Sequence, residues 1–148
     1  MIKCTFENGT PASLRHVVVD AIVVNKKKEI LLVKRSKDKV TEGGKWALPG
    51  GFMDRDETLI EAVLRETKEE TGWEIGDVEL LRVVDNPKRR NEDRQNVAFF
   101  YTCVPVKKSG KADDESSEQR WFKLDGLPEE EETAFDHLEI IEFYLRNK

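Results

Sequence analysis

The sequence "WALPGGFMDRDETLIEAVLRETKEETGW" runs from Trp46 to Trp73 and is the most informative segment of the chain. Its first part holds a Gly-Gly pair, and its second part spaces apolar residues as a helix does. Glu69 and Glu70 follow Glu66 at spacings of three and four residues, which places the three side chains beside one another on a helix. The stretch therefore predicts an acidic helix directly behind a glycine loop.

The expected helix has Asp56 as its N-cap and carries two distinct faces. The face that should pack on a sheet consists of Ile60, Val63, Leu64, Thr67 and Thr71. The glutamates lie on a neighbouring face, where each close pair of like charges costs roughly 0.2–0.5 kcal/mol. Arg65 can offset part of this repulsion by pairing with Glu69. A hard divalent cation such as Mg²⁺ would offset the rest, and a merely solvated acidic surface is the alternative interpretation.

The composition limits the classes of protein to be considered. The chain has 148 residues, 37% of them charged, with a net charge of −5, so we expect a single domain over residues 1–148 and no non-specific binding to nucleic acid. Cys4 and Cys103 lie far apart without metal-ligand spacing. No signal sequence or membrane-spanning apolar run is evident, so the expected location is the cytoplasm, without a membrane partner.

The remaining sequence predicts strands and one further helix. Residues 16–25 and 29–35 are β-branched apolar runs joined by a lysine-rich turn, which predicts a hairpin. Further strands are expected at 78–85, 96–106 and 118–124. The tail predicts a helix in which Asp136 and Glu139 form the two ends of a capping box. These elements indicate an α+β fold, with a mixed sheet covered by helices.

The spacing of the acidic stretch resembles the signature of a known family. It contains Gly51, five residues, Glu57, seven residues, Arg65-Glu66, then Glu69-Glu70 and Gly72. This resembles the Nudix hydrolase signature, G-x5-E-x7-R-E-U-x-E-E-x-G-U with U an apolar residue, at every charged and glycine position. Thr67 replaces the usual aliphatic residue, Trp73 is bulky for the last position, and Asp56 stands where many members have Gly.

The resemblance implies an α/β/α sandwich that hydrolyses a nucleoside diphosphate linked to another group, with Mg²⁺ or Mn²⁺ as cofactor. The family's metal-ligating glutamates match Glu66, Glu69 and Glu70, and a further acid that assists the metals or the water matches Glu57. Arg65 matches the residue that orients these glutamates. A general base would be a glutamate of the signature, such as Glu69, or an acid on a later loop before a Trp-containing strand, which matches Glu115.

Residues outside the signature indicate the substrate. Gly50 and Gly51 let a ligand approach the backbone closely, and Arg35 at the end of a strand is a candidate phosphate contact. Pro87, about fifteen residues beyond the signature, and the tail "AFDHLEI" resemble the ADP-ribose pyrophosphatase branch. The basic cluster after this proline, including Arg89 and Arg90, could bind phosphate or ribose phosphate. The predicted reaction is therefore hydrolysis of ADP-ribose to AMP and ribose 5-phosphate.

Two other functions remain open. One is a house-cleaning pyrophosphatase of the same family that acts on nucleoside triphosphates, and the other is a non-catalytic domain that senses ADP-ribose. A small nucleotide is the expected ligand in each case, and the sequence leaves open whether two copies pair into a homodimer. Phe52, Phe99 and Tyr101 could stack a base or belong to the core, while His16 and His137 are interpreted as structural or surface residues.

Overall fold

The computed structural model describes residues 1–89, 94–112 and 116–148. Its strands are β1 (Ile2–Thr5), β2 (Pro11–Leu14), β3 (Val17–Val23), β4 (Ile30–Arg35), β5 (Trp46–Ala47), β6 (Gly50–Phe52), β7 (Trp73–Val84), β8 (Val97–Lys108) and β9 (Ser116–Phe122). Its helices are α1 (Leu59–Thr71), α2 (His137–Arg146) and the short 3-10 helix η1 (Glu130–Glu132). The expected strands and both expected helices are therefore present.

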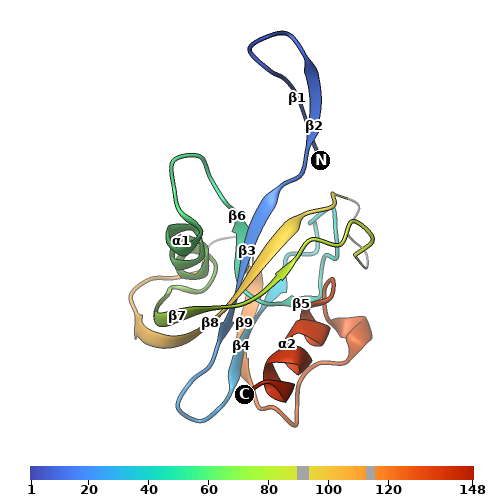
Figure 1. Cartoon of the computed structure of the whole chain (residues 1–148). Helices are drawn as coiled ribbons and strands as arrows, with labels where there is room; N and C mark the ends of the chain where they lie inside the picture. Colours follow the sequence, from blue (N-terminus) through green and yellow to red (C-terminus); the bar gives the residue numbers. More distant parts are fainter. Residues whose placement is uncertain (90–93, 113–115) are drawn as a thin grey trace.

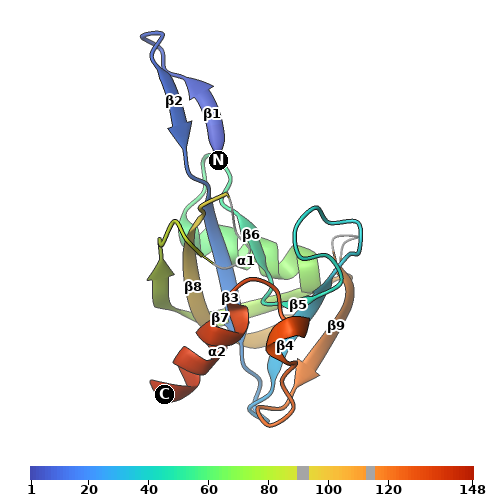
Figure 2. The same ribbon diagram turned by 90° about the vertical axis from the view of Figure 1, so that its right-hand side faces the viewer.

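The body is a sandwich with the strands between two helices, as Figures 1 and 2 show. One sheet has the order β6-β3-β8-β7 and is mixed, because β3 runs parallel to β8 and antiparallel to β6. A second sheet has the order β5-β4-β9 and is antiparallel. This arrangement confirms the expected α+β sandwich around a mixed sheet.

Strand β3 contributes to a different core on each of its faces, because successive side chains of a strand point in opposite directions. Val19, Ala21 and Val23 pack with the α1 residues Ala62 and Val63. The other face joins a cluster with α2, made of Val18, Ile22, Ile30, Leu32, Trp46, Leu48, Ala98, Phe100, Phe122, Ile140 and Ile141. Each fully buried aliphatic side chain of this kind contributes about 1.5–3 kcal/mol.

The expected hairpin over residues 16–35 is wrong. A tight turn does join the two strands, with the Lys28 N–H donating to the Asn25 carbonyl at 2.9 Å. However, β3 and β4 belong to different sheets and share only the bridge between Val24 and Ile30 among the described pairings. Both strands are buried on both faces, so their sequences carried no alternation that could fix their partners.

Both predicted helix caps need correction. Helix α1 begins after Thr58, which forms a capping box with Glu61, whereas Asp56 lies in the preceding loop with φ 70°. This left-handed conformation gives a physical reason for the Gly that many Nudix members have at that position. Asp136 is the N-cap of α2 but makes no capping hydrogen bond with its side chain, so the predicted box with Glu139 does not form.

The buried face of α1 is rotated from the expected one. Val63, Thr67 and Thr71 are buried as predicted, but Ile60 is 41% and Leu64 36% exposed. Ala62 and Glu70 complete the buried face in their place. Because Glu70 belongs to the buried face, the helix directs one of its glutamates into the body of the protein.

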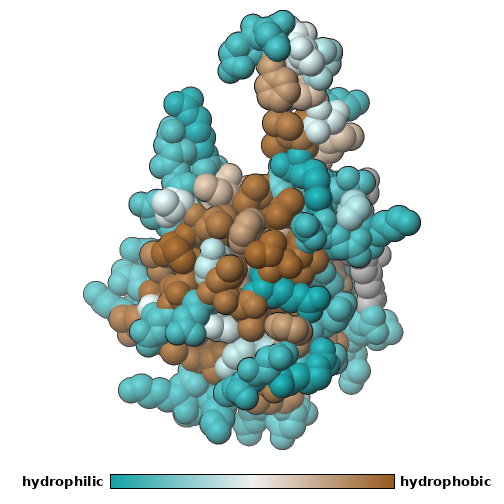
Figure 3. Space-filling model, in the orientation of Figure 1, coloured by the Kyte–Doolittle hydropathy of each residue, from teal (hydrophilic) through white to brown (hydrophobic). Residues whose placement is uncertain are grey.

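Two apolar surfaces remain uncovered in the structure. The hairpin of β1 and β2 stands away from the body in Figures 1 and 2. Figure 3 shows apolar side chains gathered on the face viewed in Figure 1, and exposed residues of β7 and β8 include Leu80, Val83, Val104 and Val106.

Neither the length nor the hydropathy needed for a membrane-spanning helix is found in any helix of the described residues.

Candidate active site

Arg65 is the hub of the acidic helix. Its guanidinium donates to both carboxylate oxygens of Glu57, at 3.1 and 2.7 Å, to Glu66 at 2.8 Å and to Glu69 at 3.1 Å. It also donates to the backbone carbonyl of Phe52 at 3.0 Å, which ties the helix to β6. The predicted pairing with Glu69 is confirmed, and the same side chain also binds Glu57 and Glu66.

The charges of this cluster support one another. The hydrogen bonds from Arg65 and from the Asp54 backbone N–H hold the pKa of Glu57 below its ordinary value. The bond to Glu57, followed by those to Glu66 and Glu69, raises the pKa of Arg65. The hydrogen bonds from Arg65 therefore favour the ionised form of Glu57, which is the form that a carboxylate needs in order to bind a cation.

The Gly-Gly loop lies directly against two of the glutamates. The Gly50 N–H donates to Glu70 Oε2 at 3.0 Å. A Cβ built on Gly51 would lie 2.5 Å from Glu66 Oε2, so any other residue there would displace that carboxylate. The close approach expected of this loop is therefore an approach to the protein's own carboxylates, which it holds at the edge of the cavity.

These residues fit a divalent metal ion, although no ready cage exists. Among the described residues, no three Asp, Glu, His or Cys side chains already form a group that could hold a metal ion. Arg65 engages Glu57, Glu66 and Glu69 instead. Mg²⁺ typically keeps several waters and takes only one or two carboxylates together with substrate phosphates, so a complete protein cage is not required. Carboxylate oxygens held against a glycine backbone suit such an ion.

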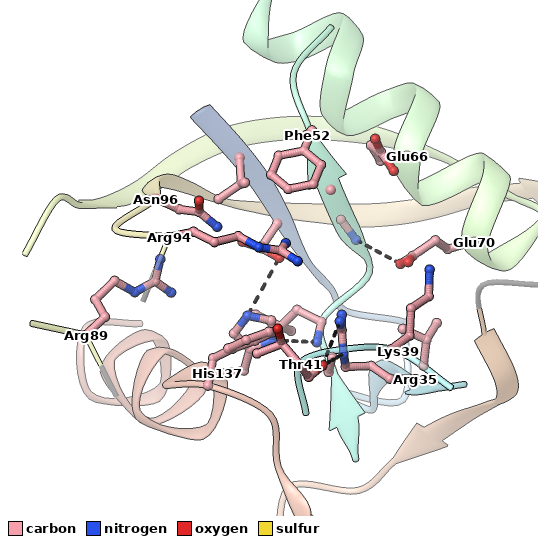
Figure 4. Close-up of a pocket in the computed structure, with 18 of the residues that line it drawn as sticks. Arg35, Lys39, Thr41, Phe52, Glu66, Glu70, Arg89, Arg94, Asn96 and His137 are labelled. Atoms are coloured by element: carbon pink, nitrogen blue, oxygen red, sulfur yellow. Dashed lines mark hydrogen bonds and ion pairs between the residues drawn. The ribbon is translucent and has the colours of Figure 1, made fainter. Parts of the chain in front are cut away.

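A cavity of about 330 Å³ opens beside these carboxylates. Figure 4 shows Glu66 and Glu70 on the α1 side, with Arg35 and His137 on the opposite side. The remaining described lining residues are Val18, Asp20, Val33, Lys39, Val40, Thr41, Ala47, Leu48, Gly50, Gly51, Phe52, Arg89, Arg94, Asn96 and Phe135. Of the three aromatic residues considered for stacking, Phe52 lines this cavity, while Phe99 and Tyr101 belong to the α1-side core.

The two described arginines predicted to contact substrate both lie in the cavity wall. Arg35 donates to the Thr41 carbonyl, at 3.2 Å from Nε and 3.1 Å from Nη2, and its guanidinium lies 5.1 Å from the Phe135 ring. Arg89 forms a buried two-point pair with Asp136, at 2.9 and 2.5 Å. Burial opposes ionisation of Asp136, but Arg89 still lowers its pKa. Asp136 thus binds Arg89 where the sequence predicted a helix cap.

Two residues that the sequence predicts for the site lie outside the described part of the chain. Arg90, a predicted phosphate contact, and Glu115, a predicted general base, fall in the ranges 90–93 and 113–115. Their roles stay predictions. Glu69, the other candidate base, is described, and its side chain is 51% exposed on the outer side of α1.

Asp20 and His137, at the floor of the cavity, were not among the residues predicted for the site. Asp20 on β3 is 7% exposed, and His137 at the start of α2 is 4% exposed. His137 was expected to be structural or on the surface, and it is buried with Nδ1 accepting the Leu48 N–H at 3.0 Å. The available signal was Asp20 itself, a lone charge inside the apolar run "VVVDAIVV".

Comparisons with known proteins agree with this architecture. Residues 14–144 match the family model described as NUDIX domain. A protein of Methanocaldococcus jannaschii named ADP-ribose pyrophosphatase is 40% identical over 133 residues, covering 89% of this chain and 74% of that protein. The Danio rerio 8-oxo-dGDP phosphatase NUDT18 is 32% identical over 123 residues, but the chain spans only 35% of its length and 78% of the chain is covered.

A solved structure resembles the chain over most of its length. It is the NUDIX domain of Shewanella oneidensis NrtR in complex with ADP ribose, with a TM-score of 0.75 and 29% identity. The match covers 92% of this chain and 90% of that one. The likeness therefore extends to the strands and helices that surround the cavity.

Proposed function

The chain belongs to the Nudix family, and we propose that, as a pyrophosphohydrolase of this family, it converts ADP-ribose into AMP and ribose 5-phosphate with a divalent metal ion. The observation that carries the proposal is the position of Glu66 and Glu70, held by the Gly50–Gly51 loop at the edge of the cavity. A diphosphate bound there through metal ions would be held between α1 and the cavity.

Each residue of the cluster has a distinct part in this proposal. Glu66 and Glu70 would hold the metal nearest the cavity, with Glu57 and Glu69 as further carboxylates that Arg65 brings within reach. When bound, the metal would neutralise diphosphate charge and lower the pKa of an attacking water. Arg65 would aim the carboxylates, because its fork of donors engages three of them at once. Glu69 or Glu115 would accept the proton of the water.

The choice of substrate rests on similarity and on charge. The Methanocaldococcus jannaschii relative is named an ADP-ribose pyrophosphatase and shares 40% of residues over 133 positions. Arg35, Lys39 and Arg94 also line the cavity, and such cations suit the phosphate groups of a nucleotide. The triphosphatase alternative has less support, since the relative with the higher identity and the higher coverage of the two is named an ADP-ribose pyrophosphatase.

A substrate screen tests the proposed function directly. ADP-ribose, sugar nucleotides, nucleoside triphosphates and 8-oxo-dGDP would be incubated with Mg²⁺ and with Mn²⁺ in parallel, and products separated by chromatography. We expect the highest kcat/KM for ADP-ribose, with AMP and ribose 5-phosphate as products. Turnover of none of these compounds with either metal would contradict hydrolysis, and preference for a triphosphate would select the alternative.

The remaining proposals concern the molecule as a whole. We expect Mg²⁺ to serve as the usual metal ion, residues 1–148 to act as one domain, and the cytoplasm to be the location. A homodimer would bury the exposed apolar residues of β7 and β8, among them Leu80 and Val106. Light scattering at several protein concentrations would give the oligomeric state.

A further inference from the structure

The floor of the cavity holds a carboxyl group and an imidazole that the metal-binding helix does not use. Asp20 comes from the centre of β3 and His137 from the first position of α2, so the fold joins two distant parts of the chain. Asp20 Oδ1 lies 3.7 Å from His137 Nε2. Figure 4 shows His137 on the side of the cavity opposite the metal-binding helix.

The imidazole presents a fixed hydrogen-bond donor. Its Nδ1 accepts the backbone N–H of Leu48 at 3.0 Å, so in the neutral ring the proton must sit on Nε2. Burial lowers the pKa of His137 to about 3, which keeps the ring neutral under ordinary conditions. The Nε2–H group therefore faces Asp20 in one defined tautomer.

Within residues 1–89, 94–112 and 116–148, the carboxyl group of Asp20 has no hydrogen-bond partner, and His137 is its ion-pair contact. It accepts no hydrogen bond from any residue in the described ranges, and 3.7 Å to Nε2 is longer than a hydrogen bond. Burial raises its pKa to about 7. A buried polar group left without partners costs free energy, and a ligand that supplies them recovers that cost.

The floor pair lies next to the carboxylates proposed to bind metal. Asp20 pairs with Gly50 across β3 and β6, and a Cβ built on Gly50 would lie 2.8 Å from Asp20 Oδ1. The following residue, Gly51, makes the corresponding close approach to Glu66. A ligand whose diphosphate lies at Glu66 would therefore place the group bonded directly to that diphosphate over the floor, and in a nucleotide this group is a sugar.

We propose that Asp20 and His137 bind two neighbouring hydroxyl groups of the ribose attached to the diphosphate. One hydroxyl accepts the Nε2–H of His137, and its neighbour donates to the carboxyl group of Asp20. A vicinal diol suits this pair because each hydroxyl can both donate and accept. The inference rests on the proposed function, in that a nucleoside diphosphate derivative occupies the cavity, and it adds selection against deoxyribose.

The test uses calorimetric titrations with Mg²⁺ and ligands that the protein does not hydrolyse. Ribose 5-phosphate is compared with 2-deoxyribose 5-phosphate, and AMP with 2′-deoxy-AMP, on the wild type and on Asp20→Asn. We expect the wild type to bind the ribose form of at least one pair about tenfold more tightly, as the loss of one buried hydrogen bond predicts. The Asn variant keeps an acceptor oxygen but loses the negative charge, so the weaker hydrogen bond should measurably reduce that preference. Asp125→Asn, an exposed change on the far turn, is the matched control.

The outcomes separate this inference from the proposed function. Pyrophosphate with Mg²⁺ should bind both proteins equally, which shows that the variant is folded and that its metal carboxylates are intact. An equal preference for ribose in wild type and variant overturns the inference, as does no preference in the wild type. If Asp20→Asn instead changes the ratio of AMP to IMP affinity, the floor contacts the base and the sugar assignment is wrong. None of these results depends on ADP-ribose turnover.

Discussion

Carboxylates in two places at the same cavity have opposite electrostatic environments. On α1 and in the loop before it, Glu57, Glu66 and Glu69 receive hydrogen bonds of 2.7–3.1 Å from Arg65, and Glu66 among them lines the cavity. On the floor, Asp20 is buried without such a partner among the described residues, and its pKa rises to about 7. Arg65 holds the pKa of Glu57 below its ordinary value, whereas Asp20 loses its charge near neutral pH.

The difference indicates what each group can bind. A carboxylate that remains ionised next to a partly exposed guanidinium can exchange that partner for a divalent cation, which needs negative ligands. A buried carboxyl group near its pKa is better suited to hydrogen bonds from a neutral ligand. The carboxylates beside Arg65 are therefore suited to bind a metal ion, and Asp20 is suited to bind a neutral polar group. The local environment causes this difference, because the functional group is the same.

The largest effect should come from Glu70→Gln. Glu70 is 8% exposed and bound to the Gly50 N–H, so we expect its loss to lower kcat roughly a thousandfold, since metal-held charge stabilisation supplies several kcal/mol. Glu69→Gln should cost less, because that side chain is 51% exposed. Initial rates give kcat, and melting curves with and without Mg²⁺ should show a smaller metal-induced rise in Tm for Glu70→Gln.

Glu79→Gln, an exposed change on β7, serves as the control for the removal of one negative charge. If Glu70→Gln keeps the wild-type rate and the wild-type shift in Tm, the α1 carboxylates are only a solvated surface, and the contrast with the floor has no functional meaning.

Replacing Arg65 tests whether pairing prepares the α1 group. Lysine offers one charged group in place of a fork, so Arg65→Lys should hold one carboxylate and release the others. We expect kcat/KM to fall about 10–100-fold while far-UV circular dichroism stays unchanged. If Arg65→Lys keeps wild-type turnover at saturating Mg²⁺, Arg65 does not position the carboxylates for catalysis. Its hydrogen bonds would then only stabilise α1.

The floor group should be visible in the pH dependence of stability. Between about pH 4 and 7 folded Asp20 holds a proton that the unfolded chain has released, so the contribution of Asp20 to wild-type stability falls as the pH rises through this window. Asp20→Asn lacks this loss, and urea unfolding should show it gaining about 3–4 kcal/mol on the wild type from pH 4 to pH 8. The lowered pKa of His137 has the opposite effect, a rise in stability with pH, but it acts equally in both proteins and cancels in their difference. A difference that does not vary with pH would show that Asp20 stays ionised.

The smallest effect should come from Asp56, in the loop between β6 and α1. Asp56 adopts φ 70°, which glycine reaches without strain, so Asp56→Gly should change the free energy of unfolding by less than about 1 kcal/mol, towards greater stability. Its ion pair with Arg55 is too exposed to matter much. Turnover should stay at the wild-type value, and a marked loss would mean that this loop helps to position Glu57.

The two groups also differ in how far the sequence predicts them. Arg65 and its glutamates lie within a single helix and the loop before it, so spacing along the chain was enough to bring them together. Asp20 and His137 meet only because β3 and α2 pack on each other, and no local pattern encodes that contact. For the same reason the strands were found but the 16–35 hairpin was wrong, since pairing depends on partners far along the chain.

Side-chain competition accounts for the other failures. Asp136 carried a capping signal, yet Arg89 offers it a charged two-point bond that a backbone N–H cannot match. Ile60 and Leu64 fitted an apolar stripe, but the need to bury Glu70 against Gly50 turned α1 away from them. In each case a contact specific to the site prevailed over a general preference.

The alternation along β3 has an evolutionary consequence. Val19 and Ala21 pack against α1, the helix that carries the proposed metal ligands. Asp20 lies between them in the sequence and points to the opposite face, towards His137 of α2. A substitution at Asp20 or His137 therefore changes the floor of the cavity without replacing a side chain that packs against α1. A descendant of this protein could thus acquire a new substrate preference step by step, each intermediate still able to cleave a diphosphate.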